Sequence, residues 1–143
     1  ADLKRLQSRH IQWLEQRPAM LLLQQHLFIH ADTLNYLEYG SNIQEINTCI
    51  QTILQGNDIL AYDRLDEKFA DRNAFSGGDG MTRASQLLVR FGGSRIIHGH
   101  TPIAKITGQD PTTVTEALEY ADGLCVNVDH GLYLGGQGFC YRV

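Results

Sequence analysis

The chain has 143 residues, 43% of them hydrophobic and 20% charged, and a formal net charge of −4 at pH 7. This length predicts a single globular domain over 1–143 that buries roughly two-thirds of its unfolded surface. The small negative charge gives no electrostatic reason to expect a nucleic acid or membrane partner. No apolar run reaches the ~20 residues of a bilayer span, and no signal peptide opens the chain. Three cysteines without C-x-x-C spacing favour a reduced, cytoplasmic location.

The first elements expected along the chain are a helix and a hairpin. Residues 3–16 have the apolar spacing of an amphipathic helix, and Pro18 ends it. Two short apolar runs, 19–23 and 27–31, are separated by three polar residues. This pattern is typical of two strands joined by a tight turn.

The middle of the chain is predicted to be helical. Isoleucines repeat at helical spacing through 43–55, with Asn42 placed as the N-terminal cap and Glu45 as its capping-box partner. Two further helices are expected over 58–70 and 82–91.

Strands predominate in the last third of the chain. A pair of glycines ends the preceding helix, and a buried strand is expected at 95–98. Later strands are predicted at 118–120, 124–128 and 139–143. The sum is a mixed α/β (α+β) fold.

Two histidines stand in similar contexts, each at the end of a short apolar strand. His30 follows Leu27-Phe-Ile, and His100 closes Ile97-His-Gly-His, after which Pro102 turns the chain away. Taken singly, each also fits a histidine hydrogen-bonded within a loop. Imidazoles delivered by neighbouring strand ends can share a metal ion. The paired contexts therefore favour a metal site.

Four segments occur in a characteristic order along the chain: Leu27-Phe-Ile-His-Ala-Asp-Thr33, Tyr36-Leu-Glu-Tyr-Gly40, Ile97-His-Gly-His-Thr-Pro-Ile103 and Val126-Asn-Val-Asp-His-Gly131. Together they resemble the carboxyl-terminal half of a calcineurin-like metallophosphoesterase, in its bacterial serine/threonine-phosphatase-like branch. The resemblance extends from about residue 10 to residue 143.

The resemblance implies a four-layer α/β/β/α sandwich of which this chain supplies one half. It also implies two divalent metal ions, Mn, Fe or Zn, and a bridging hydroxide that attacks the phosphorus of a phosphorylated substrate. His30 and His100 match the family's two late histidine ligands. The implied activity is that of a phosphomonoesterase or a protein phosphatase.

The family's amino-terminal motifs, Asp-x-His, Gly-Asp-x-x-Asp-Arg and Gly-Asn-His-Asp/Glu, do not occur in this sequence. Gly78-Asp79-Gly80 and Gly56-Asn57-Asp58 are partly similar but out of order, and we interpret them as loop and cap residues. Because two imidazoles do not hold a binuclear centre alone, residues 1–143 are expected to be inactive in isolation. A half-sandwich also exposes an apolar sheet face, which predicts either a missing amino-terminal half or self-association.

Four further residues are candidates for substrate contact or for support of the ligands. His98 precedes the second histidine by two positions, on the same side of a strand, and a buried core role is its alternative. Asp32 can hydrogen-bond a ligand imidazole or simply form a turn. Arg72 and Arg83, like Arg95, can bind phosphate as a bidentate fork, with an ordinary surface position as the alternative.

Two other classes of function stay open at this point. One is a non-catalytic binding or regulatory module on the same half-fold. The other is a piece that completes its site only with another chain.

Overall fold

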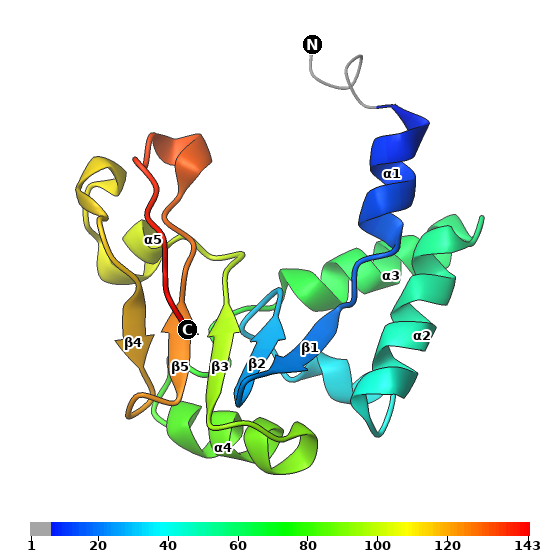
Figure 1. Cartoon of the computed structure of the whole chain (residues 1–143), viewed down its shortest axis with the longest axis horizontal. Helices are drawn as coiled ribbons and strands as arrows, with labels where there is room; N and C mark the ends of the chain where they lie inside the picture. Colours follow the sequence, from blue (N-terminus) through cyan, green and yellow to red (C-terminus); the bar gives the residue numbers. More distant parts are fainter. Residues whose placement is uncertain (1–6) are drawn as a thin grey trace.

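The computed structural model describes residues 7–143 and shows a mixed α/β fold built on one five-stranded sheet (Figure 1). The strand order is β1-β2-β3-β5-β4. The strands are β1 (Met20–Leu23), β2 (His26–Ile29), β3 (Arg95–His98), β4 (Leu118–Tyr120) and β5 (Cys125–Asn127). The inner strands β2, β3 and β5 are parallel, whereas β1 and β4 run antiparallel at the two edges. The predicted mixed α/β class is confirmed.

The helices are α1 (Ser8–Glu15), α2 (Ile43–Gln55), α3 (Ile59–Ala70), α4 (Gly80–Phe91) and α5 (Ile103–Thr107). Short 3-10 turns occur at Asn35–Glu38, Pro111–Thr113 and Leu132–Leu134. Of the helix predicted over 3–16, residues 3–6 lie outside the described part. No helix within 7–143 has the length and apolar character needed to cross a bilayer.

The predicted hairpin is present as β1 and β2, paired from Met20 with Ile29 to Leu23 with His26. Its two turn residues, Gln24 and Gln25, have φ values of 48° and 66°. Positive φ at both central residues matches the right-handed twist of the flanking strands. The turn therefore brings the end of β2 back beside the start of β1.

Helix α2 begins where the sequence predicts, because Asn42 Oδ1 accepts the backbone N–H of Glu45 at 3.0 Å. The helix is then fixed to the edge of the sheet by Asn47. Its side chain accepts from the backbone N–H of Met20 at 2.9 Å and donates to the Met20 carbonyl at 2.8 Å. Ile46 and Ile50 of the same helix are buried. This contact holds α2 against β1.

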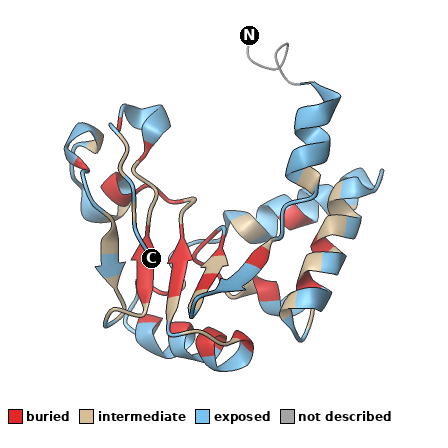
Figure 2. Cartoon of the chain, in the orientation of Figure 1, coloured by how far each residue is buried: buried red, intermediate tan, exposed pale blue. Residues whose placement is uncertain are grey.

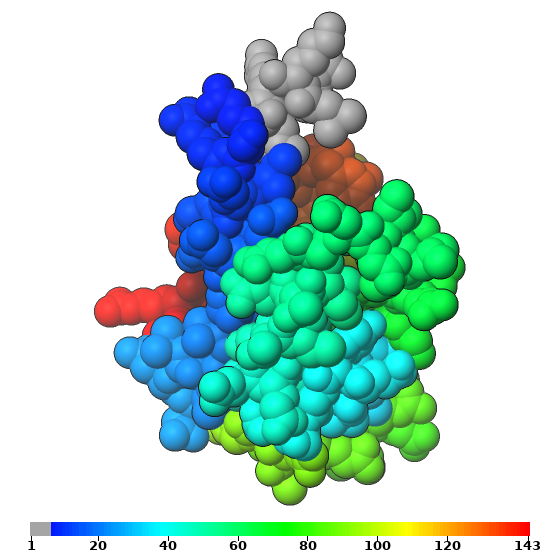
Figure 3. All heavy atoms as spheres, turned by 90° about the vertical axis from the view of Figure 1, so that its right-hand side faces the viewer, coloured from blue at the N-terminus to red at the C-terminus, as the bar shows by residue number. Residues whose placement is uncertain are grey.

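The larger hydrophobic cluster lies on one face of the sheet, and Ile97 and Val126 are buried on the other face. Leu27, Ile96 and Cys125 stand in register across β2, β3 and β5 and are fully buried. Helices α2, α3 and α4 contribute side chains to the same cluster, and buried residues concentrate on the inner strands (Figure 2). From the side, α2 and α3 form the surface beneath α1 (Figure 3).

The edge strand β1 is apolar yet exposed. Leu21, Leu22 and Leu23 are 44%, 40% and 51% exposed. The half-sandwich predicted from the sequence would expose an apolar sheet face, and both that face and its coverage by another segment or a second copy stay predictions. The predicted single domain and half-sandwich likewise stay predictions.

The strand predicted at 139–143 is wrong. These residues form no strand, because β4 already occupies the place beside β5 at that edge. Phe139 instead packs on a small cluster that contains Ile103 and Val114. The hydroxyl of Tyr141 lies 3.5 Å from the guanidinium of Arg95. The segment therefore passes across the sheet rather than extending it.

Candidate functional site

His30 directly follows the carboxyl end of β2, and His100 lies two residues beyond the carboxyl end of the neighbouring parallel strand β3. The two strand ends are joined by a hydrogen bond from the Gly99 N–H to the His30 carbonyl at 3.1 Å. The imidazole ring centroids are 4.6 Å apart, with an angle of 59° between the ring planes. Rings this close can direct nitrogen atoms at one ion, since a metal–imidazole bond is about 2.1 Å.

His100 has a backbone φ of 67°, in the left-handed region that few non-glycine residues adopt. Its Nε2 atom is buried and has no hydrogen-bond partner among the described residues. A buried nitrogen without a partner is costly unless a ligand engages its lone pair. Both observations fit an imidazole that is held in place to bind a cation.

Burial lowers the pKa of His100, and the positive charge of Arg72 lowers it further, against the carboxylates of Asp129 and Asp66. Burial also lowers the pKa of His30, with the neighbouring His100 acting in the same direction and Asp129 opposing. Both rings are therefore neutral at pH 7, which is the form that coordinates metals.

Three buried or half-buried side chains from three parts of the chain form a hydrogen-bonded row behind the histidine pair. The hydroxyl of Tyr120 donates to Asp32 Oδ2 at 2.7 Å. Its oxygen also lies within hydrogen-bond distance of Nε2 of His98, whose Nδ1 is 3.2 Å from the Gly99 carbonyl oxygen. Asp32 is only 2% exposed and His98 only 1%. This row joins β4 to the residues around both strand ends.

The second carboxylate oxygen of Asp32 accepts the backbone N–H of Phe75 at 2.6 Å. The Asp32 carbonyl accepts the N–H of Ala74 at 3.2 Å. Burial and the neighbouring Asp32 raise the pKa of Tyr120, so its hydroxyl stays protonated. Asp32, which is two residues after His30, thus connects the loop after α3 to β4.

His98 and His100 do not follow the simple strand alternation that the sequence suggested. The strand β3 ends at His98, and the left-handed conformation of His100 breaks the period of two. Burial lowers the pKa of His98, against the Gly99 carbonyl and Asp32. His98 therefore lies inside the protein as support, while His100 faces His30.

Of the candidate arginines, the structure brings only Arg72 near the histidine pair, where its charge acts on His100. Its exposed side chain donates to the Ala70 carbonyl at 3.1 Å. Helix α4, which carries Arg83, lies at the opposite end of the sheet (Figure 1). Arg95 pairs with Glu119 at 3.2 Å across the edge of the sheet.

Asp129 forms a turn shortly after β5. Its Oδ1 accepts the Gly131 N–H at 2.9 Å, and its carbonyl accepts the Ile103 N–H at 2.8 Å. Within residues 7–143, no three His, Cys, Asp or Glu side chains are arranged to hold a metal ion. The described chain therefore offers a pair of imidazoles and not a full coordination sphere.

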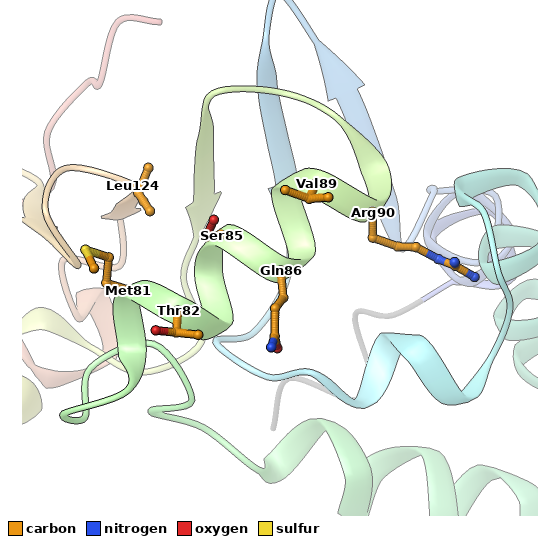
Figure 4. Close-up of a pocket in the computed structure, with 7 residues that line it drawn as sticks. All are labelled: Met81, Thr82, Ser85, Gln86, Val89, Arg90 and Leu124. Atoms are coloured by element: carbon orange, nitrogen blue, oxygen red, sulfur yellow. The ribbon is translucent and has the colours of Figure 1, made fainter.

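A hollow of about 780 Å³ lies over α4 and includes Met81, Ser85 and Arg90 (Figure 4). It is at the end where the parallel strands begin. Sites in sheets of this kind are found outside the carboxyl ends of the strands. The hollow contains neither candidate histidine, and we do not assign the site to it.

Comparisons with known proteins support the fold. The structure is similar to a solved structure of a cold-active protein tyrosine phosphatase, with a TM-score of 0.66 and 17% sequence identity. The likeness covers 90% of this chain and 38% of that chain, so this chain spans well under half of the phosphatase's length. Neither a protein-family model nor a curated protein matches the sequence. At this identity the likeness shows an α/β fold shared with a phosphatase.

Sequence reasoning missed Tyr120 and Asp66. Tyr120 reaches Asp32 across 88 positions of the chain, and only the register of β4 against β5 places it there. Asp66 is exposed on α3, within the helix that the sequence predicts over 58–70. The signal in the sequence was their residue type alone, which does not distinguish them from other surface residues.

We expect the free energy of unfolding to fall as the pH drops below 6.5, the ordinary pKa of histidine. The lowered pKa values of His30, His98 and His100 keep the folded rings neutral where the unfolded chain takes up protons. This stability is fully present above pH 6.5 and is lost as the pH falls toward the lowered values. Urea denaturation at about pH 8, 7, 6 and 5 measures it. A free energy that is constant or higher below pH 6.5 contradicts the assignment.

Proposed function

We propose that this chain is the histidine-bearing, carboxyl-terminal part of a metal-dependent phosphoesterase of the calcineurin-like type. The observation that carries the proposal is the pair His30 and His100, 4.6 Å apart at adjacent parallel strand ends. The likeness to a phosphatase fold and the order of the sequence motifs support it. Two divalent ions, Mn, Fe or Zn, are the proposed cofactors, and the remaining ligands come from a segment outside 1–143 or from a partner chain.

The bound metal would supply a Lewis acid and lower the pKa of a coordinated water from ~15.7 toward 7. In the hydrolysis, the water oxygen bonds to phosphorus, the bond from phosphorus to the leaving oxygen breaks, and a water proton ends on that oxygen. His30 and His100 are the proposed ligands, kept neutral by burial. Arg72 is the proposed phosphate-binding residue, because its charge lies beside His100 and its side chain is exposed.

The row of Tyr120, Asp32 and His98 has a supporting role in this proposal. It connects residues two positions away from each candidate ligand. Among residues 7–143 neither Asp32 nor another member of the row hydrogen-bonds the ring of His30 or His100, so the row acts on the two rings through the backbone. We infer that the row fixes the distance between the two imidazoles.

Metal titration of the chain tests the proposal. Binding of Co²⁺, followed by its visible absorption, is expected to weaken at least about tenfold in His30→Ala and in His100→Ala, since even outer-shell changes have that effect. The matched control is His26→Ala, at the other end of β2. Equal Co²⁺ binding by all of these variants would refute the assignment.

A phosphatase assay with added Mn²⁺ separates the site from the complete enzyme. The chain alone is expected to show no turnover, because two imidazoles leave the binuclear centre incomplete. Turnover by residues 1–143 at a rate near that of a version extended upstream contradicts this expectation.

A further inference from the structure

A small apolar pocket opens directly beside His30. Its volume is about 240 Å³, and it lies between α2 and α3, with His30 and Asp66 on its lining. Asp66 also acts electrostatically on His100. The pocket and the histidine pair therefore share a border, at the carboxyl end of the sheet.

The pocket's walls are aromatic and aliphatic. Helix α3 contributes Tyr62, Leu65 and Phe69, and α2 contributes Ile50 and Leu54. Pockets for drug-sized ligands have volumes of about 300–1,000 Å³, so this one suits a single ring and not a large ligand. Aromatic walls favour an aromatic ring, through stacked or edge-to-face contacts.

The pocket is fixed in position relative to the candidate site. The hydroxyl oxygen of Tyr36 accepts the backbone N–H groups of His30 at 2.8 Å and Ala31 at 3.3 Å. The ring of Tyr36 packs edge-on against Phe69, with 4.7 Å between centroids. One buried side chain thus connects the wall of the pocket to the backbone of the histidine.

The charges orient a bound molecule. Among the lining residues that belong to 7–143, Asp66 is the acidic group and none is a lysine or an arginine. A phosphate group is disfavoured beside this carboxylate. At His100, outside the pocket, the positive charge of Arg72 has a larger effect than the carboxylate of Asp129 or of Asp66. A phosphorylated molecule would therefore place its ring in the pocket and its phosphate toward the histidines and Arg72.

From this geometry we infer that the pocket binds the aromatic leaving group of an aryl phosphate monoester. The inference rests on the proposed phosphoesterase function and specifies its substrate class. The ring on the ester oxygen is the recognised feature, whether it belongs to a small molecule or to a tyrosine side chain.

The test is fluorine NMR titration of the chain with 4-fluorophenol and with 4-fluorophenyl phosphate. In Tyr62→Ala, both are expected to bind about threefold to tenfold more weakly, the range of one lost aromatic contact. Tyr62→Phe keeps the ring and is expected to bind like the parent. Ile59→Ala, on the same helix, is the matched control, because Ile59 is 75% exposed and lies outside the pocket lining.

Circular dichroism establishes that each variant is folded, and Tyr62 is a mild site for substitution because it is 50% exposed. Unchanged binding of both compounds in Tyr62→Ala overturns the inference, as does equally tight binding of ethyl phosphate. Binding of 4-fluorophenol requires neither metal nor phosphate. The Co²⁺ titration therefore tests the proposed function, and the fluorine NMR titration separately tests whether the pocket binds an aromatic ring.

Discussion

Replacing Gly80 by alanine is expected to destabilise the chain by about 3 kcal/mol or more, the upper range for overpacking a buried site. A Cβ atom at this position would lie 1.8 Å from the carbonyl oxygen of Phe75 and 2.4 Å from its carbonyl carbon. Both are backbone atoms, so no side-chain rotation relieves the contact. Either the start of α4 or the segment before it must move.

The displacement would reach the candidate site. The backbone N–H of Phe75 donates to Asp32, and the carboxylate of Asp32 also accepts the Tyr120 hydroxyl. Moving Phe75 away from Gly80 therefore strains the row behind the histidines. We expect Gly80→Ala to weaken Co²⁺ binding as well as to lower the free energy of unfolding.

Gly78→Ala is the matched control, since a Cβ atom at Gly78 would meet no atom within 4 Å. Its effect on stability is expected to stay within about 0.5 kcal/mol, as for an ordinary surface substitution. Urea denaturation followed by circular dichroism measures both variants. If the Gly80→Ala variant is as stable as the Gly78→Ala variant, the close contact described between the start of α4 and the Phe75 backbone is contradicted.

The sequence predicted those elements whose signal is local. The isoleucine spacing of 43–55 and the cap at Asn42 define α2 to the residue, and the hairpin of β1 and β2 follows from two apolar runs. Helix α4 begins at Gly80, two residues before the predicted start. The prediction placed the start later because the preceding glycines are typical of a loop. The strand predicted at 139–143 depended on a free sheet edge, which no local pattern reports.

In the candidate site, too, the residues with a local signal could be predicted from the sequence and the long-range contacts could not. His30 and His100 could be predicted because each follows a buried strand, and parallel neighbours bring such residues to one edge. The contacts that support them could not, because Asp32 meets Tyr120 only through the pairing of β4 with β5. Arg72 was one of three arginines of equal standing in the sequence, and only the loop after α3 distinguishes it.

Asp32→Ala is expected to lower the free energy of unfolding by about 2–6 kcal/mol, since each of two buried groups left unpaired costs about 1–3 kcal/mol. Two donors lose their acceptor: the Tyr120 hydroxyl and the Phe75 N–H. The matched control is Asp71→Ala, an exposed aspartate that accepts one long hydrogen bond, 3.3 Å from Thr33. Its effect is expected to stay within about 0.5 kcal/mol.

A double-mutant cycle with Tyr120→Phe measures whether the two side chains act as one unit. Tyr120→Phe alone removes the donor to Oδ2 of Asp32 and the hydrogen-bond partner of His98 Nε2, while the Phe75 N–H still donates to Oδ1 of Asp32. Once Asp32 is absent, removing the hydroxyl leaves fewer groups unpaired. The double variant is therefore expected to lose less stability than the sum of the single variants, with a coupling of about 0.5–3 kcal/mol. Additive losses would show that Asp32 and Tyr120 act independently, and the row would then not couple β4 to the histidine pair.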